Sequence, residues 1–343
     1  MTAMKLDAPL YVADADAAVG APILAELGFD GAFAFEGPED LFIPLSRAAG
    51  TTDLDLYSNV AISFPRSPTH LAQTAWDLQR FSRGHFLLGL GSQVRAHVER
   101  RFGAGFAHPV ERMADQVRAI HDVMRCWADG TPLDHDGPYW KLDLMPPLFR
   151  PVPLAGPPPP VLVAAVGPRM TAMATEVADG LILHPFTTTS HLHDHALAAV
   201  HAGLAEAGRP SEGFTVIAGT MVAVGGDDAE RRTALEAARG LVGFYGSTPA
   251  YRSTLEHLGR ADLQPTLREL TRSQRWDELA GLVDDDLVRQ IVICGDPDEV
   301  AAQLVERGHG HVDRIAITFS SGARRETLAA LVDGVRARTA ERP

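Results

Sequence analysis

Two short corners rich in small residues are the parts of this sequence whose residue types and spacing best suit ligand chemistry. The first, residues 91–93 (GSQ), ends the apolar run 86–90; the second, residues 167–169 (GPR), ends the apolar run "PVLVAAV". Small residues where a strand turns into a helix let an anion approach unpaired amides and the positive end of the helix dipole. Both corners are candidate phosphate sites, although any such turn can need glycine for structural reasons alone.

The first corner also predicts local structure. The run 86–90 is apolar enough for a strand buried on both faces. Ser92 is a favourable N-cap for a helix beginning at about Gln93, with Val94, Val98 and Phe102 on its apolar face. The segment "GLGSQV" lacks the third glycine of a dinucleotide fingerprint, which disfavours a Rossmann site.

Single polar residues follow several other predicted strands. Glu36 ends "GAFAFE" and could act as an acid or base, or could cap a helix. Asn59 ends the third strand, and His184 ends the sixth, where an imidazole could donate a hydrogen bond or carry a proton. Arg169 places a cation in the first turn of a helix, which is unfavourable unless an anion binds there or the side chain is simply solvated.

The sequence does not indicate a metal centre. His191 and His195 lie four residues apart in a helical segment, but no acidic or cysteine partner stands at a known spacing. A nucleophile elbow, a P-loop and a zinc motif are also absent from the sequence. We therefore predict no metal site.

The elements that must position these residues alternate along the chain. Apolar runs that read as strands are each followed by a helical pattern, from "KLDAPLYV" at the start to "DRIAITF" near the end. About eight strands in this order predict a (β/α)8 barrel, an α/β fold, as a single domain over residues 1–343. The residues after each strand would then meet at one mouth.

Two segments exceed what a bare barrel needs, at about 104–160 and 227–287. The first ends in the proline-rich run "PPLFRPVPLAGPPPP", which cannot continue a helix or a central strand. We predict that this arm crosses the barrel mouth and that both insertions set specificity.

Composition narrows the class of protein. Of the 343 residues, 45% are apolar, as in ordinary globular proteins, and the formal net charge is −13. This negative charge disfavours a nucleic-acid partner, because binding to nucleic acid draws on phosphate neutralisation. The sequence contains neither a run apolar enough to span a membrane nor a recognisable signal peptide, so we expect a cytoplasmic protein with no membrane partner.

Four pieces together resemble the bacterial-luciferase-like superfamily, and most closely its oxidoreductases that use the deazaflavin coenzyme F420. The pieces are "ELGFDGAFAFEGPEDLFIPL", "TAWDLQRFSRGHFLLGLGSQVRAHVERRFG", "AAVGPRMTAMATEVADGLILHPF" and "GDPDEVAAQL". The resemblance implies a (β/α)8 barrel, in agreement with the strand count, and a cofactor phosphate held by the two glycine corners. It also implies a bulge after the third strand, often with a non-prolyl cis peptide, against which the cofactor ring rests. The cofactor-binding residues predicted in this way are Asn59, Val60, Gly91, Ser92, Gln93, Gly167, Pro168 and Arg169.

One departure from the family bears on the substrate. Sugar-phosphate dehydrogenases of the family have an acidic residue followed by histidine after the second strand and a glutamate past the fourth-strand corner. The matching positions here are Glu36 with Gly37, and Val94, so we do not expect a substrate of the glucose-6-phosphate type.

The leading hypothesis is hydride transfer between coenzyme F420 and a small-molecule organic substrate, with Glu36 and His184 as candidate catalytic residues for proton transfer. One alternative is an FMN-dependent luciferase-like monooxygenase on the same fold. Another is a non-catalytic barrel that binds a flavin-like ligand as a sensor or carrier. The family resemblance also implies a homodimer.

Overall fold

Eight parallel strands close into a barrel in the computed structural model, which describes residues 4–310 and 312–340. The barrel strands are β1 (Lys5–Pro9), β2 (Gly31–Ala34), β3 (Asp55–Ser58), β5 (Phe86–Gly91), β8 (Val161–Ala165), β9 (Gly180–Leu183), β10 (Thr215–Val224) and β12 (Arg314–Phe319). The ring closes because β12 pairs with β1 and β9 pairs with β10, in each case in parallel. The predicted (β/α)8 fold is confirmed.

Two short strands extend this sheet at its carboxyl end. β4 (Ala61–Ile62) follows β3 after a two-residue bulge and pairs with the end of β5. β11 (Ile293–Gly295) pairs only with the last residues of β10, which is ten residues long. Both lengthen the barrel wall on the side where the site residues lie.

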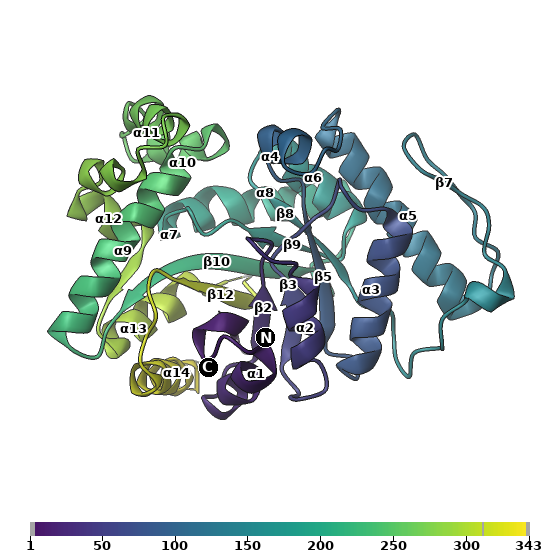
Figure 1. Cartoon of the computed structure of the whole chain (residues 1–343), viewed down its shortest axis with the longest axis horizontal. Helices are drawn as coiled ribbons and strands as arrows, with labels where there is room; N and C mark the ends of the chain where they lie inside the picture. Colours follow the sequence, from purple (N-terminus) through teal and green to yellow (C-terminus); the bar gives the residue numbers. More distant parts are fainter. Residues whose placement is uncertain (1–3, 311, 341–343) are drawn as a thin grey trace.

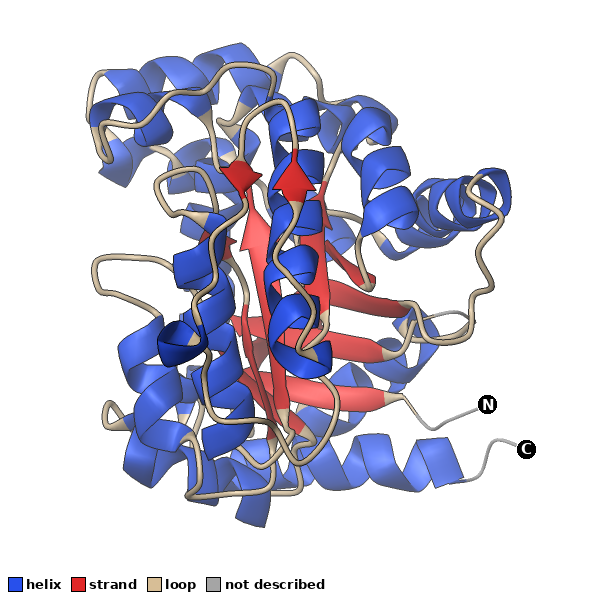
Figure 2. Ribbon diagram, turned by 90° about the vertical axis from the view of Figure 1, so that its right-hand side faces the viewer, coloured by secondary structure: helices blue, strands red, loops and turns tan. Residues whose placement is uncertain are grey.

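Helices surround the strands on all sides, as the ribbon views show (Figures 1 and 2). The longer helices of this layer are α1 (Ala17–Glu26), α2 (Phe42–Ala48), α3 (Pro68–Phe81), α5 (Pro109–Asp129), α6 (Pro168–Val177), α8 (Ala198–Glu206), α13 (Pro297–Arg307) and α14 (Arg325–Ala340). Short helices lie at strand ends: η1 (Leu10–Val12), α4 (Arg95–Arg100), α7 (Thr189–His191) and η3 (Leu192–Leu197), the last of these wound as a π-helix. Because helices cover the outside, the strands are buried on both faces and read as apolar runs.

Side chains fill the barrel interior. Phe33, Tyr57, Leu162, Ile182 and Ile217 form a buried cluster contributed by five different strands. At the amino end of the barrel Arg314 crosses the interior and donates two hydrogen bonds to Asp7, at 2.7 Å each, and one to Asp55. Among the described residues the barrel is therefore a packed core with ion pairs at its amino end, and we look for a ligand site at the carboxyl end.

The first predicted insertion, 104–160, divides into two parts. Helix α5 packs between α3 and α6 and so belongs to the helix layer of the barrel. The remainder is an arm, residues 130–160, with a small hairpin of β6 (His135–Asp136) and β7 (Lys141–Leu142) and the turn η2 (Pro147–Phe149). Figure 1 shows the hairpin standing out beyond the helix layer at the far end of α5.

The prediction that the proline-rich arm crosses the mouth is wrong. The indole nitrogen of Trp76 donates to the carbonyl of Val152 (2.9 Å). The side-chain amide of Gln79 donates to the carbonyl of Pro157 (3.2 Å). Both donors lie on α3, outside the barrel, and the arm ends where β8 begins. An arm that joins the end of α5 to the start of β8 has to run along the amino-terminal side, because both of those points lie there.

The second insertion does reach the carboxyl end. It consists of α9 (Asp228–Gly246), η4 (Pro249–Tyr251), α10 (Arg252–His257), α11 (Leu263–Arg272), η5 (Trp276–Glu278), η6 (Ala280–Leu282) and α12 (Asp285–Ile291). Its apolar side chains share a buried cluster with Met221 and Ala223 of β10 and with Phe186, which follows β9. This packing fixes the insertion on the barrel beside the sixth and seventh strands.

Within residues 4–310 and 312–340, no helix combines the length and the apolar character needed to cross a bilayer.

Candidate active site

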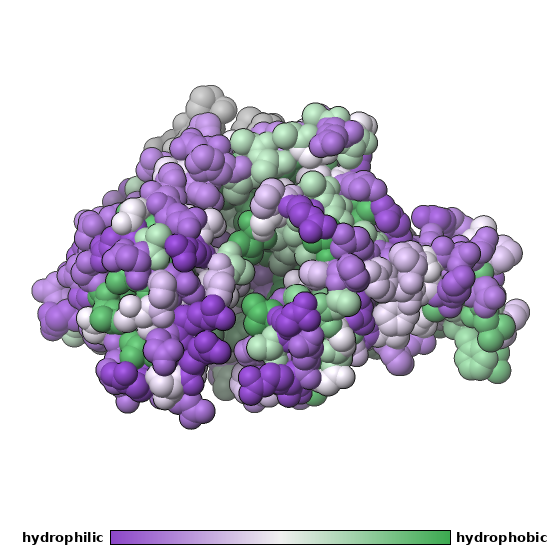
Figure 3. All heavy atoms as spheres, turned by 90° about the horizontal axis from the view of Figure 1, so that it is seen from above, coloured by the Kyte–Doolittle hydropathy of each residue, from purple (hydrophilic) through white to green (hydrophobic). Residues whose placement is uncertain are grey.

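The residues that follow the strands form a hollow at the carboxyl end of the barrel. Figure 3, which views the molecule from above, shows hydrophobic side chains within this hollow, between the second insertion and the rest of the barrel. Tyr11 and Phe35, which follow β1 and β2, are about half exposed and meet edge to face with centroids 5.7 Å apart. Val166, after β8, is also about half exposed. Large apolar side chains left in contact with water at a barrel mouth indicate a surface that a ligand covers.

The bulge after β3 lies where the sequence places it. The peptide bond between Asn59 and Val60 is cis, as the family resemblance implies. Ser58, just before it, donates its hydroxyl to the carbonyl of Gly89 and accepts from the amide of Gly89, both at 2.8 Å. The Ser58 side chain thus supplies the sheet hydrogen bonds at the point where the backbone of β3 departs from the ladder.

Gly91 is required by this bulge. A β-carbon at Gly91 would lie 2.4 Å from a methyl carbon of Val60, closer than any packing tolerates. The first glycine corner and the bulge are therefore one packed unit, although the sequence only placed them after neighbouring strands.

Two details of the first corner differ from the prediction. Helix α4 begins at Arg95 with Val94 as its N-cap, and no side chain caps it. Ser92 instead donates its hydroxyl to the carbonyl of Gln93, and Gln93 adopts a left-handed backbone with φ of 55°. The predicted N-cap role of Ser92 and the predicted helix start at Gln93 are wrong, because the left-handed residue delays the helix by two positions.

The second corner is open. Gly167 is the N-cap of α6, has no capping side chain, and a β-carbon built on it would meet nothing within 4 Å. Pro168 occupies the first turn, where its missing amide costs nothing. The amides of Met170 and Thr171 already donate to the carbonyl of Gly167, which leaves the amide of Arg169 in the first turn of this ten-residue helix for an anion.

Arg169 has a partner that the sequence did not reveal. Its guanidinium donates to a carboxylate oxygen of Glu111 at 2.7 Å, and both side chains are at least half exposed. Glu111 lies in the first turn of α5, so this pair links α6 to α5 across the rim. The ion pair with Glu111 therefore explains why a cation is tolerated at the start of α6, even when no anion is bound there.

Glu36 is fully engaged with neighbouring groups. Arg66 donates to both of its carboxylate oxygens, at 2.7 and 2.8 Å, and the amide of Ile62 donates to one of them at 2.7 Å. The Glu36 side chain is only 6% exposed. A bidentate pair of this kind fixes geometry, so Glu36 anchors the segment that follows the bulge.

His184 lies in an aromatic enclosure. Its ring stacks on Tyr251 with centroids 4.0 Å apart and meets Tyr245 edge to face at 4.8 Å. Both tyrosines come from the second insertion. The Nδ1 atom of His184 accepts from the amide of Phe186 at 3.1 Å, which assigns the proton of the neutral ring to Nε2.

The titration behaviour of these groups follows from burial. Burial lowers the pKa of His184 to about 3, so the ring is neutral at ordinary pH. Burial, followed by the neighbouring Tyr245, raises the pKa of Tyr251, and burial with the nearby Tyr11 raises that of Tyr245. The enclosure therefore offers neutral hydrogen-bond donors and no charge.

A separate hollow of about 630 Å³ lies where α9, α12, β11 and α13 meet. Arg231, Arg232, Arg289, Cys294 and Glu299 are among its lining residues. Arg231 already donates to Asp228 and to the carbonyl of Gly225. We place the candidate site at the mouth, because only the mouth brings together the ends of several barrel strands.

A barrel of this kind, with a cis peptide after its third strand and glycine corners after its fourth and fifth, defines the class to which the chain belongs. The chain is a member of the luciferase-like monooxygenase family, which it matches over residues 17–314. It is 40% identical over 331 residues to "Uncharacterized protein Rv1360" of Mycobacterium tuberculosis, with 96% of this chain and 97% of that protein covered. It is 28% identical over 325 residues to "Putative coenzyme F420-dependent oxidoreductase Rv3520c" of the same organism, with 90% and 91% covered.

The fold is shared with a solved structure of low sequence identity. The coenzyme F420-dependent tetrahydromethanopterin reductase of Methanopyrus kandleri superposes with a TM-score of 0.81 at 21% identity, over 98% of this chain and all of that one.

Proposed function

We propose that the protein is an oxidoreductase that transfers a hydride between coenzyme F420 and a small-molecule organic substrate. The observation that carries the proposal is the open, uncapped start of α6 at Gly167 beside the exposed apolar side chains of the mouth. A tricyclic ring with an anionic tail needs both features, an apolar surface for the ring and free amides for the phosphate. The relative at 28% identity is named as a coenzyme F420-dependent oxidoreductase, which supports a deazaflavin in this position.

The residues present fit this cofactor. Gly167, Pro168 and Arg169 would hold its phosphate from one side, and Gly91, Ser92 and Gln93 from the other, with Asn59 and Val60 behind the ring. When bound, the deazaflavin supplies the hydride donor or acceptor, and the protein contributes binding and orientation. Glu36 and Arg66 hold the segment after the bulge in place for that purpose.

We propose that His184 acts as a hydrogen-bond donor through Nε2–H. A group with a pKa of about 3 exchanges protons poorly near neutral pH, where general acids and bases work best when their pKa is near the working pH. A neutral imidazole can still polarise a substrate oxygen or a ring atom. Glu36, with both oxygens occupied, is better suited to positioning than to proton transfer, and its role as a proton-transfer group stays a prediction.

Substrate selection would depend on the second insertion. Tyr245 and Tyr251 line the mouth around His184, and Tyr11 and Phe35 line it after β1 and β2. These walls favour an apolar or aromatic substrate with a polar atom that can meet His184. The missing histidine and glutamate of the sugar-phosphate enzymes agree with this class.

A second candidate function is FMN-dependent monooxygenation, because the family is described by that activity. The same mouth would accept an isoalloxazine ring, and the two cofactors differ at ring position 5, where a carbon favours hydride transfer and a nitrogen permits reaction with oxygen. A non-catalytic flavin-binding barrel is the third candidate.

The reaction class can be tested directly. The purified protein is mixed with oxidised F420 and a panel of secondary alcohols, and with reduced F420 and the matching ketones, while the deazaflavin absorbance is followed. Turnover with any member supports the proposal. An oxygenated product formed from the organic substrate with reduced FMN and oxygen, together with no turnover with F420, would favour the monooxygenase. Neither activity would favour the non-catalytic barrel.

We further propose that the protein acts in the cytoplasm as a homodimer. Light scattering at micromolar concentration should give twice the chain mass of 36.8 kDa; a monomer at that concentration would contradict the dimer.

A further inference from the structure

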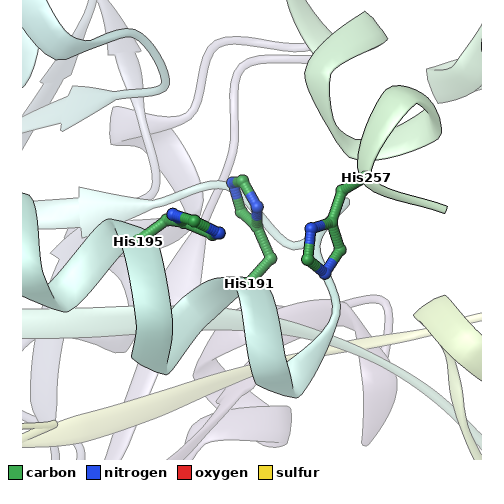
Figure 4. Close-up of side chains that lie close together, drawn as sticks. All are labelled: His191, His195 and His257. Atoms are coloured by element: carbon green, nitrogen blue, oxygen red, sulfur yellow. The ribbon is translucent and has the colours of Figure 1, made fainter.

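Three histidine side chains converge beside the mouth, outside the site described above. His191 lies on α7, His195 on the π-helical segment η3 that continues it, and His257 at the end of α10 in the second insertion. One ligand atom from each lies within 4.8 Å of the other two. Figure 4 shows the three imidazoles turned toward a common point.

The surrounding structure holds these rings together. The Thr188 hydroxyl accepts from the amide of His191 at 3.0 Å and so caps the first turn of α7. Thr254 of α10 donates its hydroxyl to the carbonyl of Phe186 at 2.9 Å, which ties α10 to the loop before α7. The convergence therefore follows from fixed contacts between two elements far apart in the sequence.

One atom of the cluster lacks a partner. The Nδ1 of His191 is buried and has no hydrogen-bond partner in the described part of the chain. Buried polar atoms are nearly always hydrogen-bonded, so an unsatisfied one commonly marks a bound ion or water.

We propose that His191, His195 and His257 bind a divalent transition-metal ion, and that the ion is Zn²⁺. Imidazole nitrogen is a preferred ligand for zinc, and three such ligands leave a fourth tetrahedral position for water. Zinc–nitrogen distances of about 2.0–2.1 Å place tetrahedral ligand atoms roughly 3.3 Å apart. His195 and His257 are exposed, so small rotations of these side chains bring the nitrogens to that spacing.

The bound ion would cross-link two helical segments. It joins α10 to the α7–η3 helix, and α10 directly follows Tyr251, the residue stacked on His184. The metal would therefore fix the insertion that closes the mouth. This inference rests on the three histidines alone and does not depend on which cofactor the barrel binds.

The test uses untagged, full-length protein that has been dialysed against a chelator. Calorimetric titration with ZnCl2 should show one ion bound per chain with a dissociation constant of micromolar or lower. The variant His257→Gln should weaken binding on the order of 100-fold. His193→Gln is the matched control, since His193 lies in the same helical segment but outside the cluster, and it should bind as the unaltered protein does.

Two further measurements separate loss of the metal site from loss of the fold. Circular dichroism should show that His257→Gln is folded, as expected for a change at an exposed side chain. Substitution with Co²⁺ should give the intense visible absorption of a tetrahedral ion in the unaltered protein and in His193→Gln, but not in His257→Gln. Binding weaker than about 100 µM, or equal affinity in the unaltered protein and His257→Gln, would overturn the proposal.

Discussion

The imidazole of His184 lies flat against the ring of Tyr251, with centroids 4.0 Å and ring planes 20° apart. His184 directly follows the barrel strand β9, whereas Tyr251 belongs to the insertion that follows the next strand, β10. The contact thus joins the barrel mouth to the segment that we expect to select the substrate.

Removing the Tyr251 ring should change the titration of His184. In Tyr251→Ala water reaches the imidazole, the burial that depresses its pKa is relieved, and the pKa should rise from about 3 toward 6.5. Tyr251→Phe keeps the stacked ring and should leave the pKa near 3. The pKa is measured from the imidazole NMR signals as a function of pH. A value that stays near 3 in Tyr251→Ala would show that other groups exclude water from His184.

The same depressed pKa predicts how stability depends on pH. Between pH 3 and 6.5 the unfolded chain holds a proton on this residue that the folded protein does not, so the free energy of unfolding rises with pH across this window. This contribution is lost as pH falls. From pH 7 to pH 5 the unaltered protein should lose about 2 kcal/mol more than His184→Gln. Urea unfolding at both pH values measures the difference, and equal losses would mean that His184 titrates normally.

Gly167 allows the proposed anion site to be tested without disturbing the fold. A side chain at this position meets open space and an ordinary backbone φ of −97°, so Gly167→Glu and Gly167→Gln should both fold. The glutamate places a negative charge where the cofactor phosphate would bind. We expect it to weaken F420 binding by about tenfold, or 1.4 kcal/mol, relative to the glutamine variant, and less at high salt. Equal affinities in the two variants would place the phosphate elsewhere.

Glu36 and Arg66 can be separated into positioning and proton-transfer roles. If Glu36 only anchors the segment after the bulge, then Glu36→Gln and Arg66→Met break the same bidentate pair and should lower F420 affinity to a similar extent. The double variant should then cost less than the sum of the single ones, since the two residues act together.

A different pattern is expected if Glu36 transfers protons. If Glu36→Gln lowers turnover far more than cofactor affinity while Arg66→Met leaves turnover intact, Glu36 transfers protons. Cofactor titration and initial rates on the three variants distinguish the two cases.

The barrel and its mouth could be predicted from the sequence, because the information is local. Each apolar run ends at a small or polar residue, and parallel strands bring those ends to one rim. The family resemblance placed the bulge at Asn59 and Val60, and the cis peptide bond is found there.

The errors arose where long-range contacts decide the structure. Trp76 and Gln79 hold the proline-rich arm against α3, and proline composition alone says nothing about such a partner. Arg169 pairs with Glu111, and Glu36 pairs with Arg66. The partners lie so far apart in the sequence that no spacing rule predicts either ion pair. His257, the third member of the histidine cluster, is 62 residues from His195, so only the fold brings them together.

The measurement that tests the central claim most directly is a titration of the purified protein with coenzyme F420 and, separately, with FMN, followed by protein fluorescence. We expect F420 to bind with a dissociation constant of micromolar or lower and FMN to bind much more weakly. Tight FMN binding with weak F420 binding would contradict hydride transfer by a deazaflavin, and binding of neither would contradict the assignment of the two glycine corners.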